Sequence, residues 1–144
     1  MIPRAEEAIV KALSVDVPAH ERMDVVEELG HANGHLRKHF VENVLVRVLK
    51  EDPNPIVRHE AAFSLGSLHG RGRQLRAASI DALCEAAHHE SSIVVRHEAA
   101  EALGWIPDPK VHNTLELIAR DSSADVVETA RISLGRHELV DPEI

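Results

Sequence analysis

Apolar residues recur at helical spacing in four similar segments of the chain, and each of these segments ends in glycine. The segments are MDVVEELG (23–30), HEAAFSLG (59–66), HEAAEALG (97–104) and ETARISLG (128–135). Another stretch with apolar residues three and four positions apart precedes each of them, at residues 4–13, 39–49, 75–87 and 111–120. Since no stretch alternates with period two over a useful length, the pattern predicts an all-α protein built from helix pairs.

The residues between the helical stretches are of the kinds that interrupt helices. Prolines stand at positions 18, 53, 55, 107 and 109, where they start or block a helix. The four glycines are expected to follow helix ends and to adopt a left-handed conformation there. The sequence therefore predicts a single domain of four helical hairpins in a short right-handed α-solenoid. Its repeats are expected at about 1–31, 35–69, 73–106 and 109–138.

A six-residue stretch, VRHEAA, occurs twice, at 57–62 and at 95–100. A helix turns by about 100° per residue, so the valine and the first alanine of this stretch share one side, which we expect to face the core. In the first copy, His59 then lies nearly opposite the core and Glu60 lies on a flank. The second copy has the same register, so hydrophobic packing requires neither histidine.

The outer repeats keep the helical pattern without the His-Glu pair. The corresponding positions hold Met23-Asp24 in the first repeat and Glu128-Thr129 in the fourth. Stacked repeats place equivalent positions side by side, about 10 Å apart, so His59-Glu60 and His97-Glu98 are expected to converge on one patch. The alternative interpretation is a solvated polar face, or a dipeptide copied when a repeat was duplicated.

Imidazole and carboxylate groups on neighbouring helices form a ligand set for a first-row transition metal. Two histidines and one carboxylate leave open positions on Fe(II) for oxygen or substrate. Helix bundles also hold di-iron centres with Glu and His side chains that project inward. Zinc is less favoured, because Cys84 is the only cysteine in the chain and has no partner for a thiolate site.

Composition limits the other functions. The chain has 144 residues and a formal net charge of −8, and aromatic residues make up 2%. The negative charge argues against binding to phosphate backbones, and so few aromatic side chains provide no platform for base stacking. A single cysteine indicates a reducing compartment, and the first residues resemble neither a signal peptide nor a membrane span. We therefore expect a cytoplasmic protein with neither nucleic-acid nor membrane partners.

Two other polar segments give weaker indications. His31, His35 and His39 are four residues apart, but Gly34 interrupts any helix across the first two. Loop histidines are therefore favoured over a second metal site. The segment HGRGRQLR (69–76) lacks the pattern of a phosphate-binding loop, and it is expected to be a solvated loop or a contact for an acidic partner.

The repeated stretches resemble the HEAT-like repeat family, in particular the short variety first known from phycobilin lyases. The signature of that family is roughly V-R-x-x-A-A-x-A-L-G, and VRHEAAFSLG (57–66) and VRHEAAEALG (95–104) are similar to it. The arginines of the signature, Arg58 and Arg96, are expected to form a structural ladder with acidic groups of neighbouring repeats. The signature is specific for architecture and does not by itself assign a function.

The two His-Glu pairs add a resemblance to the deoxyhypusine hydroxylase family. The segments IPDPKV (106–111) and SSADVVETARISLGRHEL (122–139) are also similar to it, and the likeness is good over 50–139 and loose over 1–49. Members of that family are HEAT-repeat, non-haem di-iron monooxygenases. They have two halves of four repeats, and each half has two His-Glu motifs. This chain resembles one such half.

The resemblance implies roles for the paired residues. His59, His97 and Glu98 would be iron ligands. Glu60 would be a ligand, a catalytic group beside the ligands, or the carboxylate that holds the cationic amine of a protein or other amine-bearing substrate. The family has four His-Glu motifs, and this chain has two in the repeat register, since His20-Glu21, His89-Glu90 and His137-Glu138 fall at helix ends or outside it. A homodimer that joins its concave surfaces would therefore complete the site. Such a dimer would hold two irons and use dioxygen as co-substrate.

Two other functions stay open on the sequence. A metal-free HEAT-repeat adaptor, or a lyase- or chaperone-type scaffold, would bind a protein partner on its concave face, as solenoids commonly do. Alternatively, a metal would serve only to hold two chains together. The His-Glu pairs at equivalent repeat positions favour the oxygen-activating enzyme, because an adaptor has no need of them.

Overall fold

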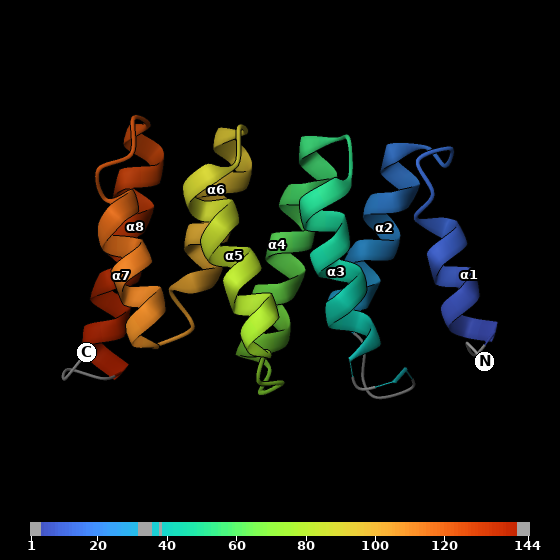
Figure 1. Cartoon of the computed structure of the whole chain (residues 1–144), viewed down its shortest axis with the longest axis horizontal. Coiled ribbons are helices and arrows are strands. Elements are labelled where there is room, and N and C mark those ends of the chain that lie inside the picture. The colour runs from blue at the N-terminus through green and yellow to red at the C-terminus, as the bar shows by residue number, and fades with distance from the viewer. Residues whose placement is uncertain (1–3, 32–35, 38, 141–144) are drawn as a thin grey trace.

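The protein is a row of helix pairs. The computed structural model describes residues 4–31, 36–37 and 39–140, and eight helices and no strands occur in these ranges. The helices are α1 (Arg4–Ala12), α2 (Ala19–Gly30), α3 (Phe40–Glu51), α4 (Pro55–Gly70), α5 (Ala77–His89), α6 (Ile93–Leu103), α7 (Pro109–Ile118) and α8 (Ala124–Val140). Helices α3, α5 and α7 lie in front of α4, α6 and α8 in Figure 1. The prediction of an all-α solenoid of helix pairs is confirmed.

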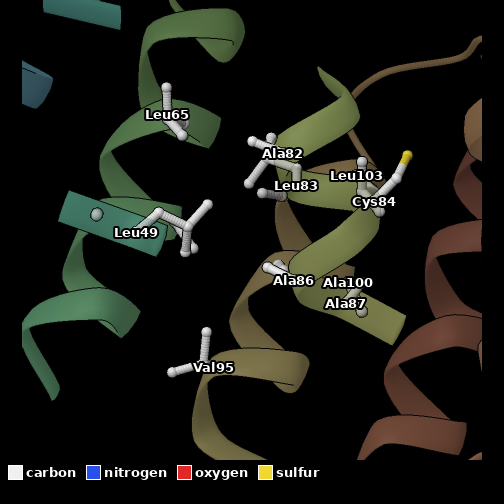
Figure 2. Packing of buried hydrophobic residues seen from close by; sticks show 14 of the residues in the cluster. Leu49, Leu65, Ala82, Leu83, Cys84, Ala86, Ala87, Val95, Ala100 and Leu103 are labelled. Carbon is white, nitrogen blue, oxygen red and sulfur yellow. The ribbon is translucent and has the colours of Figure 1, made fainter. Parts of the chain in front are cut away.

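The even-numbered helices form a continuous layer, in which α2 packs on α4, α4 on α6 and α6 on α8. The hydrophobic core lies between this layer and the odd-numbered helices. Figure 2 shows part of it, with Leu49 and Leu65 on one side and Ala82 and Leu83 on the other. Cys84 is buried beside them. None of the helices in the described part of the chain is both long and apolar enough to cross a membrane.

The repeated glycines do not have the predicted role of left-handed helix ends. Helix α4 continues to Gly70 and α8 continues beyond Gly135, and Gly104 has right-handed φ and ψ angles of −61° and −20°. Among the described glycines, a positive φ occurs only at Gly72 (86°). The prediction was wrong because it considered each helix alone, whereas Gly30, Gly66 and Gly104 are required by the neighbouring helix.

The glycines let successive even-numbered helices approach closely. A Cβ atom at Gly30 would lie 2.8 Å from the Oγ of Ser64, and one at Gly66 would lie 2.9 Å from the Cβ of Ala102. Gly104 has an equivalent contact with α8, where an added Cβ would meet a serine Oγ at 2.5 Å. The glycines of the first three repeats are therefore a packing requirement that sets the distance between α2, α4, α6 and α8, whereas a Cβ at Gly135 would meet nothing within 4 Å among the described residues.

Arginine ladders join consecutive helix pairs at the other end of the even-numbered helices. The ion pairs, with N···O distances of 2.9, 2.8 and 3.0 Å, are Arg22–Asp52, Arg58–Glu90 and Arg96–Asp121. The predicted ladder of Arg58 and Arg96 is confirmed. Arg22 occupies the same position in the first pair and was missed, because the residues after it do not match the signature.

Candidate metal centre

The four predicted site residues lie on adjacent helices of the even-numbered layer, with His59 and Glu60 on α4 and His97 and Glu98 on α6. The valine and both alanines of each VRHEAA copy are fully buried. This burial confirms that the core side of each helix is where the sequence predicted it. The four polar side chains are half-buried, because adjacent helices of the layer cover their flanks.

The central contact of the site joins two helix pairs. His59 Nε2 lies 3.0 Å from Glu98 Oε2, and the two side chains are only 27% and 12% exposed. The histidine of one dipeptide thus meets the glutamate of the next. The two residues of a single dipeptide point in directions about 100° apart on their helix. The site is therefore assembled between α4 and α6.

The contact between α6 and α8 has the same register. His97 Nδ1 lies 2.7 Å from Thr129 Oγ1, and Thr129 occupies in α8 the position that Glu60 has in α4 and Glu98 has in α6. The Thr129 hydroxyl also donates to the backbone carbonyl of Asp125, at 2.9 Å. Alignment of the repeats pairs Thr129 with the glutamates, but sequence reasoning treated it only as a position where the motif is lost.

The carboxyl groups of the site are in an unfavourable environment for negative charge. Burial raises the pKa of Glu98 above its usual value, and Glu101 adds to this effect while the neighbouring histidines oppose it. Burial likewise raises the pKa of Glu60, where His59 opposes the shift and Glu27 of α2 adds to it. A bound cation would replace the lost hydration and offset the repulsion among these carboxylates.

The candidate ligands are not gathered into one metal-binding group in the structure. Within residues 4–31, 36–37 and 39–140, no group of three or more His, Cys, Asp or Glu side chains is arranged so that it could hold a metal ion. The fold brings His59 and Glu98 into contact and leaves Glu60 and His97 on either side of them. Glu60 lies towards α2 and His97 towards α8.

Exposed apolar side chains border the site, and the sequence analysis did not predict them. A pocket of about 610 Å³ is lined by Glu98 together with Phe63 and Trp105, whose side chains are 47% and 53% exposed. A pocket of about 410 Å³ beside it is lined by His97 and Ile132, the latter 52% exposed. The polar cluster therefore opens onto an apolar surface that an organic ligand or a protein could cover.

The other polar segments have structural contacts. Arg71 donates a hydrogen bond of 2.6 Å to the carbonyl of Gly30, and its Nη1 lies 3.2 Å from His31 Nδ1. This arginine therefore provides a hydrogen-bond donor for a backbone carbonyl at the C-terminal end of α2. His31 follows α2, His39 precedes α3, and both are exposed, as expected of loop histidines. His35 lies outside the described residues.

Known proteins share this architecture. The family model for HEAT repeats matches residues 42–135. Deoxyhypusine hydroxylase of Gallus gallus is 36% identical over 88 residues, which are 60% of this chain and 27% of that protein. The Aspergillus clavatus enzyme is 38% identical over 102 residues, which are 69% of this chain and 28% of that protein. The structure of human deoxyhypusine hydroxylase in complex with glycerol is similar with a TM-score of 0.79 and 25% identity.

The structural likeness extends over 97% of this chain but only 46% of the human protein. The aligned sequence likewise corresponds to only 27% and 28% of the chicken and Aspergillus enzymes. The chain therefore resembles about half of a deoxyhypusine hydroxylase, in agreement with the resemblance found in its motifs. Both VRHEAA copies fall within the matched repeats, and the chain belongs to the HEAT repeat family.

Proposed function

We propose that this chain is one half of a non-haem di-iron monooxygenase of the deoxyhypusine hydroxylase type. His59, Glu60, His97 and Glu98 would hold the iron. The observation that carries the proposal is the 3.0 Å contact between His59 and Glu98 across α4 and α6. This contact belongs to a chain whose fold is similar to about half of human deoxyhypusine hydroxylase. The reaction class is oxygen-dependent hydroxylation of a protein or other amine-bearing substrate.

The donor atoms of these residues are of the kinds that suit iron. Nitrogen and carboxylate oxygen donors without thiolate suit non-haem Fe(II), which uses two histidines and one carboxylate in many oxygenases. Here two histidines and two glutamates lie on adjacent helices, and Cys84 is buried in the core away from them. The raised pKa values of Glu60 and Glu98 arise from burial among like charges, an arrangement that a divalent cation relieves.

Each side chain of the site has a distinct task in this proposal. His59 and Glu98 would exchange their mutual hydrogen bond for ligation, since the same Nε2 and Oε2 atoms serve both purposes. His97 would bind through Nε2, because its Nδ1 is engaged with Thr129. Glu60 lies beside the pair and would act as a ligand or accept a hydrogen bond from a substrate ammonium group. Iron, when bound, would supply the activation of dioxygen.

The surroundings would position an organic substrate. The pocket of about 610 Å³ has Phe63 and Trp105 on its wall next to Glu98. These apolar side chains would exclude water from the alkyl part of a substrate. Glu101, which lines the same pocket, would hold a cationic end. Exclusion of water also strengthens the electrostatic interactions within the site.

A second copy of the chain would complete the site. One chain offers one His-Glu contact with one further glutamate and one further histidine beside it, and a twofold interface uses the same surface of each copy. Four carboxyl groups lie at or near the site on each copy, those of Glu27, Glu60, Glu98 and Glu101, and only Glu101 has an arginine partner here, Arg136 at 3.6 Å, in the ion pairs of the described residues. Two such surfaces repel each other unless cations lie between them. We therefore expect iron binding and dimerisation to be coupled, with two irons per dimer.

The test is anaerobic loading of the untagged protein with Fe(II), followed by elemental analysis and light scattering after size exclusion. The expected result is about one iron per chain, since each copy supplies the ligands of one metal, and a mass of two chains. Protein that takes up no iron would contradict the proposed function. A strict monomer that retains two irons would contradict the shared site.

Substitution of single residues tests which side chains bind iron. His59→Ala and Glu98→Gln should lose iron and keep their helical content, because neither side chain belongs to the core. His88→Ala is the matched control, since His88 is exposed at the end of α5, away from the site. Retention of iron by both site variants would refute the ligand assignment, and loss of helicity would refute the placement of the residues outside the core.

One observation favours a second function. Phe63, Trp105 and Ile132 are exposed and line the two pockets that Glu98 and His97 border, and exposed apolar groups of this kind suit a protein-binding scaffold. A metal-free HEAT adaptor would use this surface without iron. In that case the wild-type protein would take up no iron, and Phe63→Ser would abolish complex formation with its partner while His59→Ala would not.

A further inference from the structure

The hydroxyl of Thr129 has two contacts that together bear on His97. Its Oγ1 lies 2.9 Å from the carbonyl oxygen of Asp125, one turn earlier in α8. The same Oγ1 lies 2.7 Å from His97 Nδ1, across the interface with α6. Thr129 is buried, with 6% of its surface exposed. Water is therefore a poor competitor for either contact.

A threonine hydroxyl has one proton and two lone pairs. A carbonyl oxygen can only accept, so the hydroxyl proton is used when Thr129 donates to Asp125. The remaining interaction with His97 then requires that Nδ1 carry a hydrogen and donate it to Oγ1. This arrangement makes both contacts favourable, whereas donation from Oγ1 to Nδ1 would leave two acceptor oxygens facing each other at 2.9 Å without a proton between them.

We propose that Thr129 is a positioning residue that fixes His97 as the Nδ1–H tautomer and so keeps Nε2 free as a metal-binding atom. The metal-directed part of this inference rests on the proposed function. Free neutral histidine in water mostly has its proton on Nε2, so the protein must impose the other form. Histidine ligands are commonly oriented in this way by a hydrogen bond to the ring nitrogen that does not bind the metal.

The position of Thr129 in the repeats explains why a threonine is present. It corresponds to Glu60 and Glu98 in the preceding repeats. Thr129 contacts His97 of the preceding even-numbered helix in the same way that Glu98 contacts His59. The two contacts differ in the atom engaged, which is Nε2 in His59 and Nδ1 in His97. His59 must therefore give up its partner to bind a metal, whereas Nε2 of His97 has no hydrogen-bond partner among the described residues while Thr129 keeps the ring in place.

The tautomer can be measured without any metal. Long-range ¹H–¹⁵N spectra of metal-free, ¹⁵N-labelled protein at about pH 8, where imidazoles are neutral, distinguish protonated from unprotonated ring nitrogens. The His97 signals are those missing from His97→Gln. We expect protonated Nδ1 in the wild-type protein and in Thr129→Ser, and a shift towards protonated Nε2 in Thr129→Val. Protonated Nε2 in the wild-type protein would overturn the inference.

Thr114→Val is the matched control, because Thr114 donates to the carbonyl of Lys110 one turn earlier but has no histidine partner in the hydrogen bonds of the described residues. It should leave the His97 spectrum unchanged. A change as large as that in Thr129→Val would show that loss of any such helical hydrogen bond disturbs the ring, and it would overturn the specific role of Thr129. Circular dichroism establishes that each variant is folded.

Binding of Co(II), a spectroscopic substitute for Fe(II), tests the consequence for the metal. Loss of a group that orients a ligand typically weakens metal binding by about 10- to 100-fold, and we expect this for Thr129→Val, with Thr129→Ser close to the wild-type protein. Equal affinity of Thr129→Val and wild type would overturn the inference. If the wild-type protein binds neither Co(II) nor Fe(II), the proposed function and the metal-directed part fail together, and the NMR spectra alone decide the tautomer.

Discussion

Gly66 of α4 lies directly against Ala102 of α6, and adding one methyl group there tests how the even-numbered layer is built. In Gly66→Ala, the new Cβ would lie 2.9 Å from the Cβ and 3.2 Å from the Cα of Ala102. Non-bonded carbon atoms prefer about 3.5–4.0 Å, so the two helices must separate by roughly 0.5–1 Å. No rotamer change can relieve the contact, because both atoms are fixed to the backbone.

Two opposing effects determine how far Gly66→Ala changes the free energy of unfolding. Overpacking of this kind costs about 1–3 kcal/mol, and replacement of glycine by alanine within a helix returns up to about 1 kcal/mol. Gly70, at the end of the same helix, isolates the second effect, because nothing lies within 4 Å of its added Cβ. We therefore expect Gly70→Ala to be neutral or stabilising, and Gly66→Ala to be less stable than Gly70→Ala by about 1–3 kcal/mol.

Urea unfolding followed by circular dichroism measures both variants. The double variant Gly66→Ala, Ala102→Gly completes a cycle, because it removes the methyl group that the new one meets. A favourable coupling energy of about 0.5–3 kcal/mol is expected for such neighbours. If Gly66→Ala is as stable as Gly70→Ala and the coupling is zero, the glycine is not needed for helix approach. Since α4 and α6 also hold His59 and Glu98, the same variant should weaken Fe(II) binding.

Two further predictions concern ion pairs outside the site. Arg22→Ala should lower the free energy of unfolding by about 3–5 kcal/mol, because it leaves the carboxylate of Asp52 buried without its arginine partner. Arg47→Ala removes only an exposed ion pair and should lower the free energy of unfolding by about 0–1 kcal/mol. Equal losses of the two variants in urea unfolding would contradict this contrast. The hydrogen bond from Arg37 lowers the pKa of Glu6 below its usual 4.5, so its stabilisation is present above pH 4.5 and is lost as the pH falls through the lower folded-state value. The difference in urea midpoint between wild type and Glu6→Gln should therefore be largest at neutral pH and shrink as the pH falls below 4.5, and a difference that grows on acidification would refute the assignment.

The helices could be predicted from the sequence because the patterns that indicate them lie within each helix and its flanking residues. Helical spacing of apolar residues predicted every helix of the described chain, and α4 and α7 begin where Pro55 and Pro109 follow the capping residues Asn54 and Asp108. The role of the repeated glycines could not be predicted from such local patterns. A glycine near the end of a helical pattern has the same appearance whether it adopts a left-handed conformation or admits a neighbouring helix, and only the position of that neighbour distinguishes the two.

The candidate site was predicted in its residues but not in its contacts. A helical wheel places His59 away from the core, and the equivalent position of His97 follows from the repeat. A single wheel cannot show which adjacent helix a flanking side chain meets, so it gave no indication that His59 pairs with Glu98 or that His97 meets Thr129. The bordering aromatic side chains were missed for a related reason, since exposure depends on what the adjacent repeat leaves uncovered.

The register of these contacts explains why histidine and glutamate are repeated as a dipeptide. Each histidine reaches the following repeat and each glutamate lies towards the preceding one, so a single dipeptide makes no His-Glu contact. Two dipeptides in consecutive repeats are the smallest number that gives one contact, between His59 and Glu98. They also leave an outer glutamate, Glu60, and an outer histidine, His97, on either side. Each copy thus keeps one glutamate and one histidine outside the His59–Glu98 contact, with Nδ1 of His97 engaged by Thr129, and the dimer that we propose would use both side chains at its shared metal site.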